Sequence, residues 1–371
     1  MPDHPMKTSR LLVRLDAQIE VARTPIEADC KRAERACYLA RTGRIADAQA
    51  VVADLHQRYG LRPHIEVSVW VHLAEGLIGH FSEVDPTARQ KIQRAKALCT
   101  AANLKHMQAL TSAWMASMEY ARLNMDAMFA EVETSLVHAV PQHHSARARA
   151  ALAVAQAVHL AGRIDLARTW YDRVRIHTLP DGDDATISAL MHGMASLHGE
   201  LLRQTAMAGF PYVPESANAL VGAESNKRFD ELTRITSLQS LEPLLRAQIH
   251  SLLGNFGEAC KLYEENLDAM DLRGGRRLQA HLLADRAWCR LKIGMRERAL
   301  DDAHLALEQF VEETQLDDRA TAHGRLAQIF EAVGQVDRAA YHSQLAQQFW
   351  AKFAVVQAGI LRRLPQISAL W

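Results

Sequence analysis

Histidine is the residue type in this chain whose number first suggests chemistry, because 18 of the 371 residues are histidines. Two histidines that bind one metal ion from the same helix must lie three or four residues apart, so that both rings face one side. No two histidines here have that spacing, although His72 and Glu75 form a mixed pair that does. We therefore assign no metal site, and a site assembled from several helices stays open as the alternative.

The five cysteines also lack the pattern of a reactive or disulfide-bonded site. They are odd in number and widely spread, which favours reduced thiols in a cytoplasmic protein. Cys30 and Cys37 lie two helical turns apart, and we expect them to behave as small buried side chains. The chain has no phosphate loop, no GxSxG elbow and no GxGxxG turn. We therefore assign no catalytic residue and no cofactor, and we expect a protein that is not an enzyme.

Charge and hydropathy narrow the classes of partner. Lys and Arg together number 43, and so do Asp and Glu, so the formal net charge is zero. A nucleic-acid-binding protein usually has a basic excess to neutralise phosphates, so we do not expect a nucleic-acid partner. No run approaches the ~18 apolar residues that would span a bilayer, so we expect no membrane partner. The most favoured partner is a protein or peptide.

The helices that would position binding residues are indicated by a repeated pattern. An alanine is followed seven residues later by a glycine and five residues after that by another alanine, and the last three glycines recur every 40 residues. Such a period indicates stacked helix pairs, with the glycine ending the first helix and the alanines allowing close packing. The copies are Ala36/Gly43/Ala48, Ala155/Gly162/Ala167, Ala247/Gly254/Ala259, Ala287/Gly294/Ala299 and Ala327/Gly334/Ala339.

The most regular unit is the stretch ADRAWCRLKIGMRERALDDAHLAL, residues 284–307. It resembles the tetratricopeptide-repeat (TPR) superfamily, in a variant with a period of 40 instead of 34 residues, similar to bacterial regulatory members. The period and the resemblance predict an all-α fold, a right-handed superhelical solenoid of about eight antiparallel helix pairs. One irregular unit ends at Asn124, which we expect to replace the turn glycine in the left-handed conformation.

The pattern divides the chain into four parts. Residues 1–206 form an N-terminal TPR-like array with irregular repeats, and residues 223–350 form the regular C-terminal repeats. Residues 207–222, with two prolines and two glycines, are predicted to be an inserted loop. Residues 351–371 are predicted to be a C-terminal helix that either caps the array or forms a homodimer.

The resemblance also implies where a ligand binds. In the family, the first helices line a concave groove, and residues at fixed places before the turn glycine point into it. The groove implied here is polar and nearly uncharged, with Trp288 as an apolar anchor. It departs from the carboxylate clamp that some members carry. The candidate residues are Arg149, Gln156, His159, Gln248, Ser251, His281, Trp288, Gln328 and Glu331.

The functional hypothesis is therefore a non-enzymatic adaptor or regulator that binds a protein or peptide segment in the concave groove. Two alternatives stay open. The first is a sensor module that binds a peptide or small molecule and regulates a downstream effector. The second is a scaffold that assembles with itself, including a homodimer through the C-terminal helix.

Overall fold

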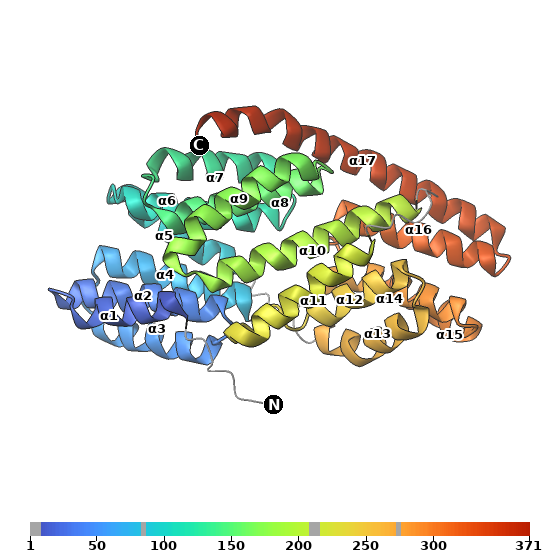
Figure 1. Ribbon diagram of the computed structural model, residues 1–371, viewed down its shortest axis with the longest axis horizontal. Coiled ribbons are helices and arrows are strands. Elements are labelled where there is room, and N and C mark those ends of the chain that lie inside the picture. Colours follow the sequence, from blue (N-terminus) through green and yellow to red (C-terminus); the bar gives the residue numbers. More distant parts are fainter. Residues whose placement is uncertain (1–8, 83–86, 208–215, 272–275) are drawn as a thin grey trace.

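The protein is helical throughout the part that the computed structural model describes, which is residues 9–82, 87–207, 216–271 and 276–371. For residues 216, 217 and 268–271 only the backbone is described. These residues form 17 helices and no strand, as predicted (Figure 1). The helices are α1 (Arg10–Glu20), α2 (Pro25–Arg41), α3 (Ile45–Tyr59), α4 (Ile65–Phe81), α5 (Ala88–Ala101), α6 (Lys105–Tyr120), α7 (Met125–His138), α8 (His144–Leu160), α9 (Ile164–Asp181), α10 (Asp184–Met207), α11 (Ser216–Thr233), α12 (Glu242–Leu252), α13 (Phe256–Asp271), α14 (Arg276–Lys292), α15 (Arg296–Glu308), α16 (Leu316–Ala332) and α17 (Val336–Ala369).

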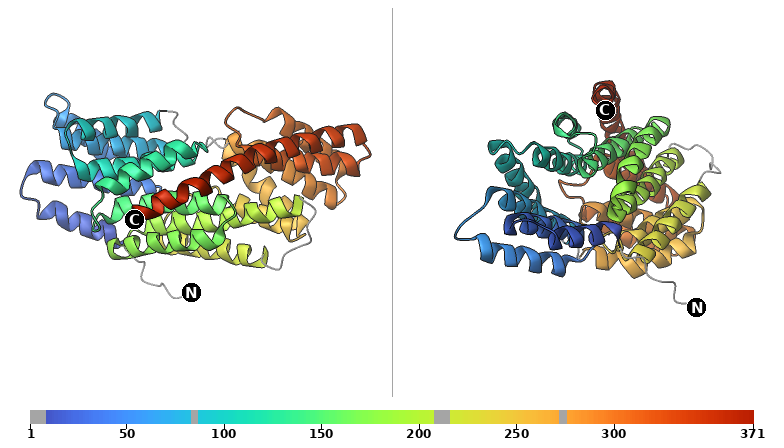
Figure 2. Two further views of the ribbon diagram at one scale, coloured as in Figure 1. Left: turned by 90° about the horizontal axis from the view of Figure 1, so that it is seen from above. Right: turned by 60° about the vertical axis from the view of Figure 1, so that its left-hand side comes forward.

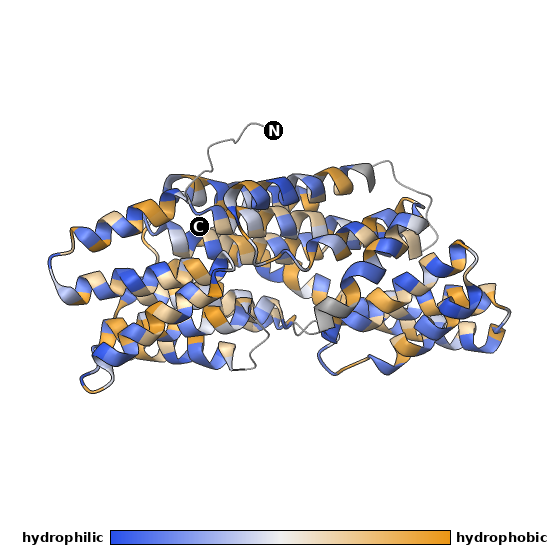
Figure 3. Cartoon of the chain, turned by 90° about the horizontal axis from the view of Figure 1, so that it is seen from below, coloured by the Kyte–Doolittle hydropathy of each residue, from blue (hydrophilic) through white to orange (hydrophobic). Residues whose placement is uncertain are grey.

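From α2 onward the helices pack in adjacent pairs, from α2 with α3 to α16 with α17. The even-numbered helices are the first members of their pairs, and several of them also pack on the first helix of the next pair, as α2 does on α4 and α14 on α16. Apolar residues recur along each helix between polar ones, which is the pattern of helices that bury one face (Figure 3). Of these described helices, none is long and apolar enough to cross a membrane.

The turn glycines have the predicted conformation. Gly43, Gly162, Gly254, Gly294 and Gly334 have φ values between 78° and 86°, in the left-handed region that closes a helix. At Asn124 the prediction is wrong by one residue. Leu123 takes the left-handed conformation, with φ 55°, because the N–H of Asn124 donates to the carbonyl of Glu119 and so closes the end of α6. Asn124 is instead the residue before α7.

The alanines of the repeat lie where neighbouring helices meet. In the first four copies of the pattern, both alanines are completely buried. Ala327 and Ala339 of the last copy are partly exposed. The small side chains let α2 approach α3 and α14 approach α15 closely, as the sequence predicted.

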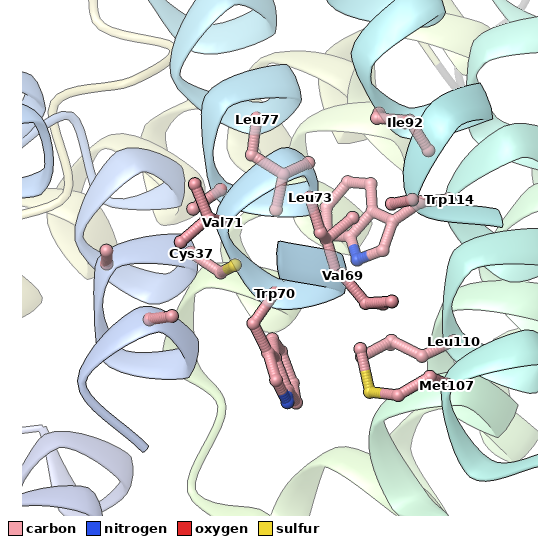
Figure 4. Close-up of a cluster of buried hydrophobic side chains, with 14 of the residues drawn as sticks. Cys37, Val69, Trp70, Val71, Leu73, Leu77, Ile92, Met107, Leu110 and Trp114 are labelled. Carbon is pink, nitrogen blue, oxygen red and sulfur yellow. The ribbon is translucent and has the colours of Figure 1, made fainter. Parts of the chain in front are cut away.

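Larger side chains fill the spaces between pairs. In the N-terminal half, Trp70, Leu73 and Leu77 of α4 pack with Leu110 and Trp114 of α6 (Figure 4). Further clusters surround Phe129 and Tyr171, and Tyr263 and Phe330. The five cysteine thiols are unpaired, and all except Cys30 are buried, so they act as small core side chains.

The segment 207–222 is not a continuous loop. Met207 is the last residue of α10, and residues 216–222 belong to α11, so the loop prediction is wrong at these positions. Residues 208–215 of the predicted loop lie outside the described residues. Gly222 lies inside α11, where the helix packs close to Ala195 of α10.

Residues 351–371 do not form a separate helix, because α17 continues without interruption from the last repeat to Ala369. This helix runs back over α7 and α8, so that the C-terminus lies beside the first half of the chain (Figures 1 and 2). Its buried face consists of Phe353, Ile360, Leu364 and Ile367, which pack in the cluster around Phe129. The apolar face of this segment is therefore covered within the chain.

Candidate functional site

A central cavity of about 290 Å³ lies between the two halves of the chain. All the helices that line it are first members of their pairs, namely α6, α8, α10, α12, α14 and α16. Its walls combine leucines with amide, imidazole and charged groups. The lining residues are Tyr120, Ala121, Leu123, Gln156, Leu160, His192, Gly193, Ser196, Leu197, Glu200, Leu241, Leu244, Leu245, Gln248, Arg277, Leu278, His281, Leu282, Gln315, Asp317 and Asp318.

Three of the nine residues expected in a groove line this cavity: Gln156, Gln248 and His281. Gln156 lies over the bare backbone of Gly193, where an added Cβ would come within 2.6 Å of its Nε2. The Nε2 atoms of Gln248 and His281 are 3.2 Å apart. Burial lowers the pKa of His281 to about 4, so its ring is neutral at pH 7 and can accept a hydrogen bond from the Gln248 amide.

Two of the expected residues are buried inside the helix layers. His159 is 3% exposed, and its Nδ1 lies 3.0 Å from the hydroxyl of Tyr171 on the paired helix α9. Ser251 is likewise buried, within α12. Both residues lie three positions before a turn glycine, and neither lines the central cavity.

Two more of the expected residues, Trp288 of α14 and Gln328 of α16, contact Arg325. Its guanidinium lies 5.3 Å from the ring centre of Trp288 and donates a hydrogen bond of 3.0 Å to Gln328. Trp288 also lies under the ammonium group of Lys292, at 4.3 Å, so it is not the isolated apolar anchor that the sequence suggested. Glu331 is exposed.

Arg149 lines a second, smaller pocket of about 50 Å³ among α1, α2, α4, α6, α8, the end of α9 and the start of α10. Its guanidinium stacks 3.9 Å from the ring centre of Trp114 and donates to Thr186 at 3.3 Å. Burial and, to a smaller extent, the nearby charge of Arg41 lower its pKa to about 9. Asp183 pairs closely with Arg41, at 2.6 Å, and not with Arg149.

The expectation of a nearly uncharged groove is wrong. Next to the cavity, Arg203 is 1% exposed and lies between the carboxylates of Glu200, at 2.7 Å, and Asp285, at 2.8 Å. Arg325 reaches Asp285 from the other side, at 3.0 Å. Although burial raises the pKa of Asp285, these two cations outweigh burial and hold it below its ordinary value.

Neither family models nor curated proteins match this chain.

Three carboxylates gather at one side of the central cavity: Glu200 of α10 with Asp317 and Asp318 of α16. We call them the carboxylate cluster. Burial raises the pKa of all three groups, that of Asp318 to about 6. Glu200 pairs with Arg203, and Asp318 lies 3.2 Å from Nδ1 of the neutral His281. Within the part of the chain that the structure describes, no ion pair reaches Asp317, and its Oδ1 is buried without a hydrogen-bond partner.

Sequence reasoning missed these charged groups, although one signal was present. Asp285 and Arg325 are 40 residues apart, so they occupy the same place in successive repeats and carry opposite charges. Asp317 and Asp318 lie in the first turn of α16, and Glu200 lies on a helix without the glycine pattern, so no fixed spacing marks them. In the described ranges, no group of three or more His, Cys, Asp or Glu side chains could hold a metal ion.

Proposed function

We propose that this chain is a non-enzymatic repeat protein of the TPR-like superhelical type that binds a peptide, or an extended segment of a partner protein, in its central cavity. The observation that carries the proposal is the lining of the cavity, which comes from the first helices of six successive pairs. These are the helices that the resemblance implies for a groove. The five free thiols favour a cytoplasmic setting.

The chemistry of the walls supports a peptide as the ligand. Leucine side chains provide apolar contact, and the amides of Gln156 and Gln248 can both donate to and accept from a peptide backbone. A volume of about 290 Å³ is at the lower end for ligand pockets, so it fits a few side chains and not a folded domain.

A cavity-filling substitution tests this proposal. Peptides are selected from a displayed random 12-residue library on the wild-type chain, and their affinities are then measured for Ser196→Phe. Ser196 lines the cavity, so a phenyl ring there takes up the space of the ligand, and we expect a loss of affinity of about tenfold or more.

Ser343→Phe is the matched control, because Ser343 is exposed on α17. Circular dichroism checks that both variants keep their helices. Equal affinity of Ser196→Phe and the wild type would show that the peptides bind elsewhere. If selection recovers no peptide, the peptide proposal is wrong.

A further inference from the structure

The carboxylate cluster and its surroundings contain more acidic than basic side chains. Four acids, the three of the cluster and Asp285, lie close to three arginines. Asp285 alone contacts two of these arginines, Arg203 and Arg325. Arg203 also forms an ion pair with Glu200, and the positive charge of Arg277 favours the ionised form of Asp318. Asp317 is the fourth acid, and it takes part in none of these ion pairs. It is 5% exposed, forms part of the cavity wall and has a buried oxygen without a hydrogen-bond partner.

The position of Asp317 and Asp318 at the start of a helix explains only part of this arrangement. Asp317 and Asp318 lie in the first turn of α16, where the helix dipole favours negative charge. That effect accounts for an exposed acidic residue at a helix end. It does not account for a buried pair that meets a third carboxylate from α10 at the wall of a cavity. Burying an unpaired carboxylate is costly, so the site favours whatever supplies the missing positive charge.

We propose that the central cavity binds the guanidinium or ammonium group of a basic side chain, with Asp317 as its main partner and Glu200 and Asp318 beside it. The inference rests on the proposed function and specifies the class of peptide: one with an arginine or lysine that enters the cavity. Leucines of α12 and α14 in the same wall would contact the aliphatic stem of such a side chain. A charge-assisted hydrogen bond in a site shielded from water is strong enough to select this group.

Two pools of capped nonapeptides test the inference. They are identical except for the central residue, which is arginine in one pool and citrulline in the other, a neutral residue of nearly the same shape. Binding of each labelled pool to the full chain is measured by fluorescence polarisation. We expect the wild type to prefer the arginine pool by about tenfold or more. In Asp317→Asn the preference should fall to nearly one, because the charge is removed while the shape is kept.

Asp301→Asn is the control, because Asp301 is an exposed aspartate on α15 and its replacement removes the same charge. It should leave the preference unchanged. A preference that survives in Asp317→Asn would overturn the assignment to Asp317. Equal binding of the two pools by the wild type, abolished by Ser196→Phe, would overturn the cation inference and leave the proposed function standing. Absence of binding by both pools would overturn the proposed function itself, and binding of agmatine alone would replace the peptide by a small cation.

Discussion

Gly294 has a backbone conformation that a residue with a Cβ adopts only at a cost. Its φ is 86°, and an added Cβ would meet no atom within 4 Å. Gly294→Ala should therefore reduce the free energy of unfolding by about 1 to 2 kcal/mol through backbone strain alone. Urea unfolding followed by circular dichroism measures this change.

Gly257→Ala is the control for this prediction. Gly257 lies in α13, is exposed and also has free space around its Cβ position. There alanine suits the helix, so the same substitution should raise the free energy of unfolding by about 0.5 to 1 kcal/mol. A loss of stability of equal size at both glycines would show that strain at the turn is not the cause.

The turn residues also show what local sequence can predict. The five glycines are predicted correctly because glycine is the residue for which the left-handed conformation is nearly free. Leu123 has no such preference, and it adopts this conformation where its side chain lines the central cavity and packs beside the cluster around Phe129. Tertiary contacts decide that position, so no rule about single residues finds it.

At the scale of helices, the repeat predicts the pairs well and the cavity only in part. Gln156 and Gln248 lie six residues before a turn glycine, and both reach the cavity. Trp288 and Gln328 have the same spacing but lie around Arg325. A fixed spacing defines the face of a helix, whereas the neighbouring pairs decide what covers that face. The carboxylate cluster depends on α10 and α16 coming together, which the sequence pattern does not encode.

Helix α17 should be held in place by the buried half of its C-terminal segment. Ile360 is completely buried against the cluster around Phe129, while Val355 is 69% exposed. Ile360→Ala leaves a cavity and should cost about 2 to 5 kcal/mol. Hydrogen exchange should then become faster in residues 351–369 and in α7, and stay unchanged in α13 and α15.

The same replacement at Val355 tests whether burial is the cause. Val355→Ala removes little buried surface, so hydrogen exchange should remain close to that of the wild type. Fast exchange in residues 351–369 of the wild-type chain would contradict the packing of α17 on α7 and α8. Two polar contacts add to this packing, from Gln357 to the carbonyl of Leu160 and from Arg363 to Glu133.

At the scale of the whole molecule, buried neutral histidines link stability to pH. Burial lowers the pKa of five of them from 6.5 to about 4, so the folded chain binds fewer protons than the unfolded chain between these values. Their stabilising effect is fully present above pH 6.5 and is lost as the pH falls toward 4. They are His143, His159, His177, His281 and His323.

Five acids act in the opposite direction. Burial raises the pKa of Asp230 and Asp318 to about 6, that of Asp317 well above its ordinary value, and those of Glu200 and Glu242 above theirs. The folded chain therefore holds protons on these groups that the unfolded chain releases, and acidification favours folding there. The pKa values of His192 and His342 are lowered by burial as well, so the histidines together outnumber the acids and we expect the histidines to dominate.

The free energy of unfolding should accordingly decrease between pH 7.5 and pH 5, as measured by urea unfolding. In His159→Gln this decrease should be smaller by about 1 kcal/mol per pH unit below pH 6.5, because one group that takes up a proton on unfolding is gone. His138→Gln replaces a half-exposed histidine and provides the matched comparison. A stability that rises toward pH 5 would show instead that the carboxylates around the central cavity control the response. The carboxylate cluster would then be the main pH-sensitive element of the fold, and Asp317→Asn would remove most of that rise.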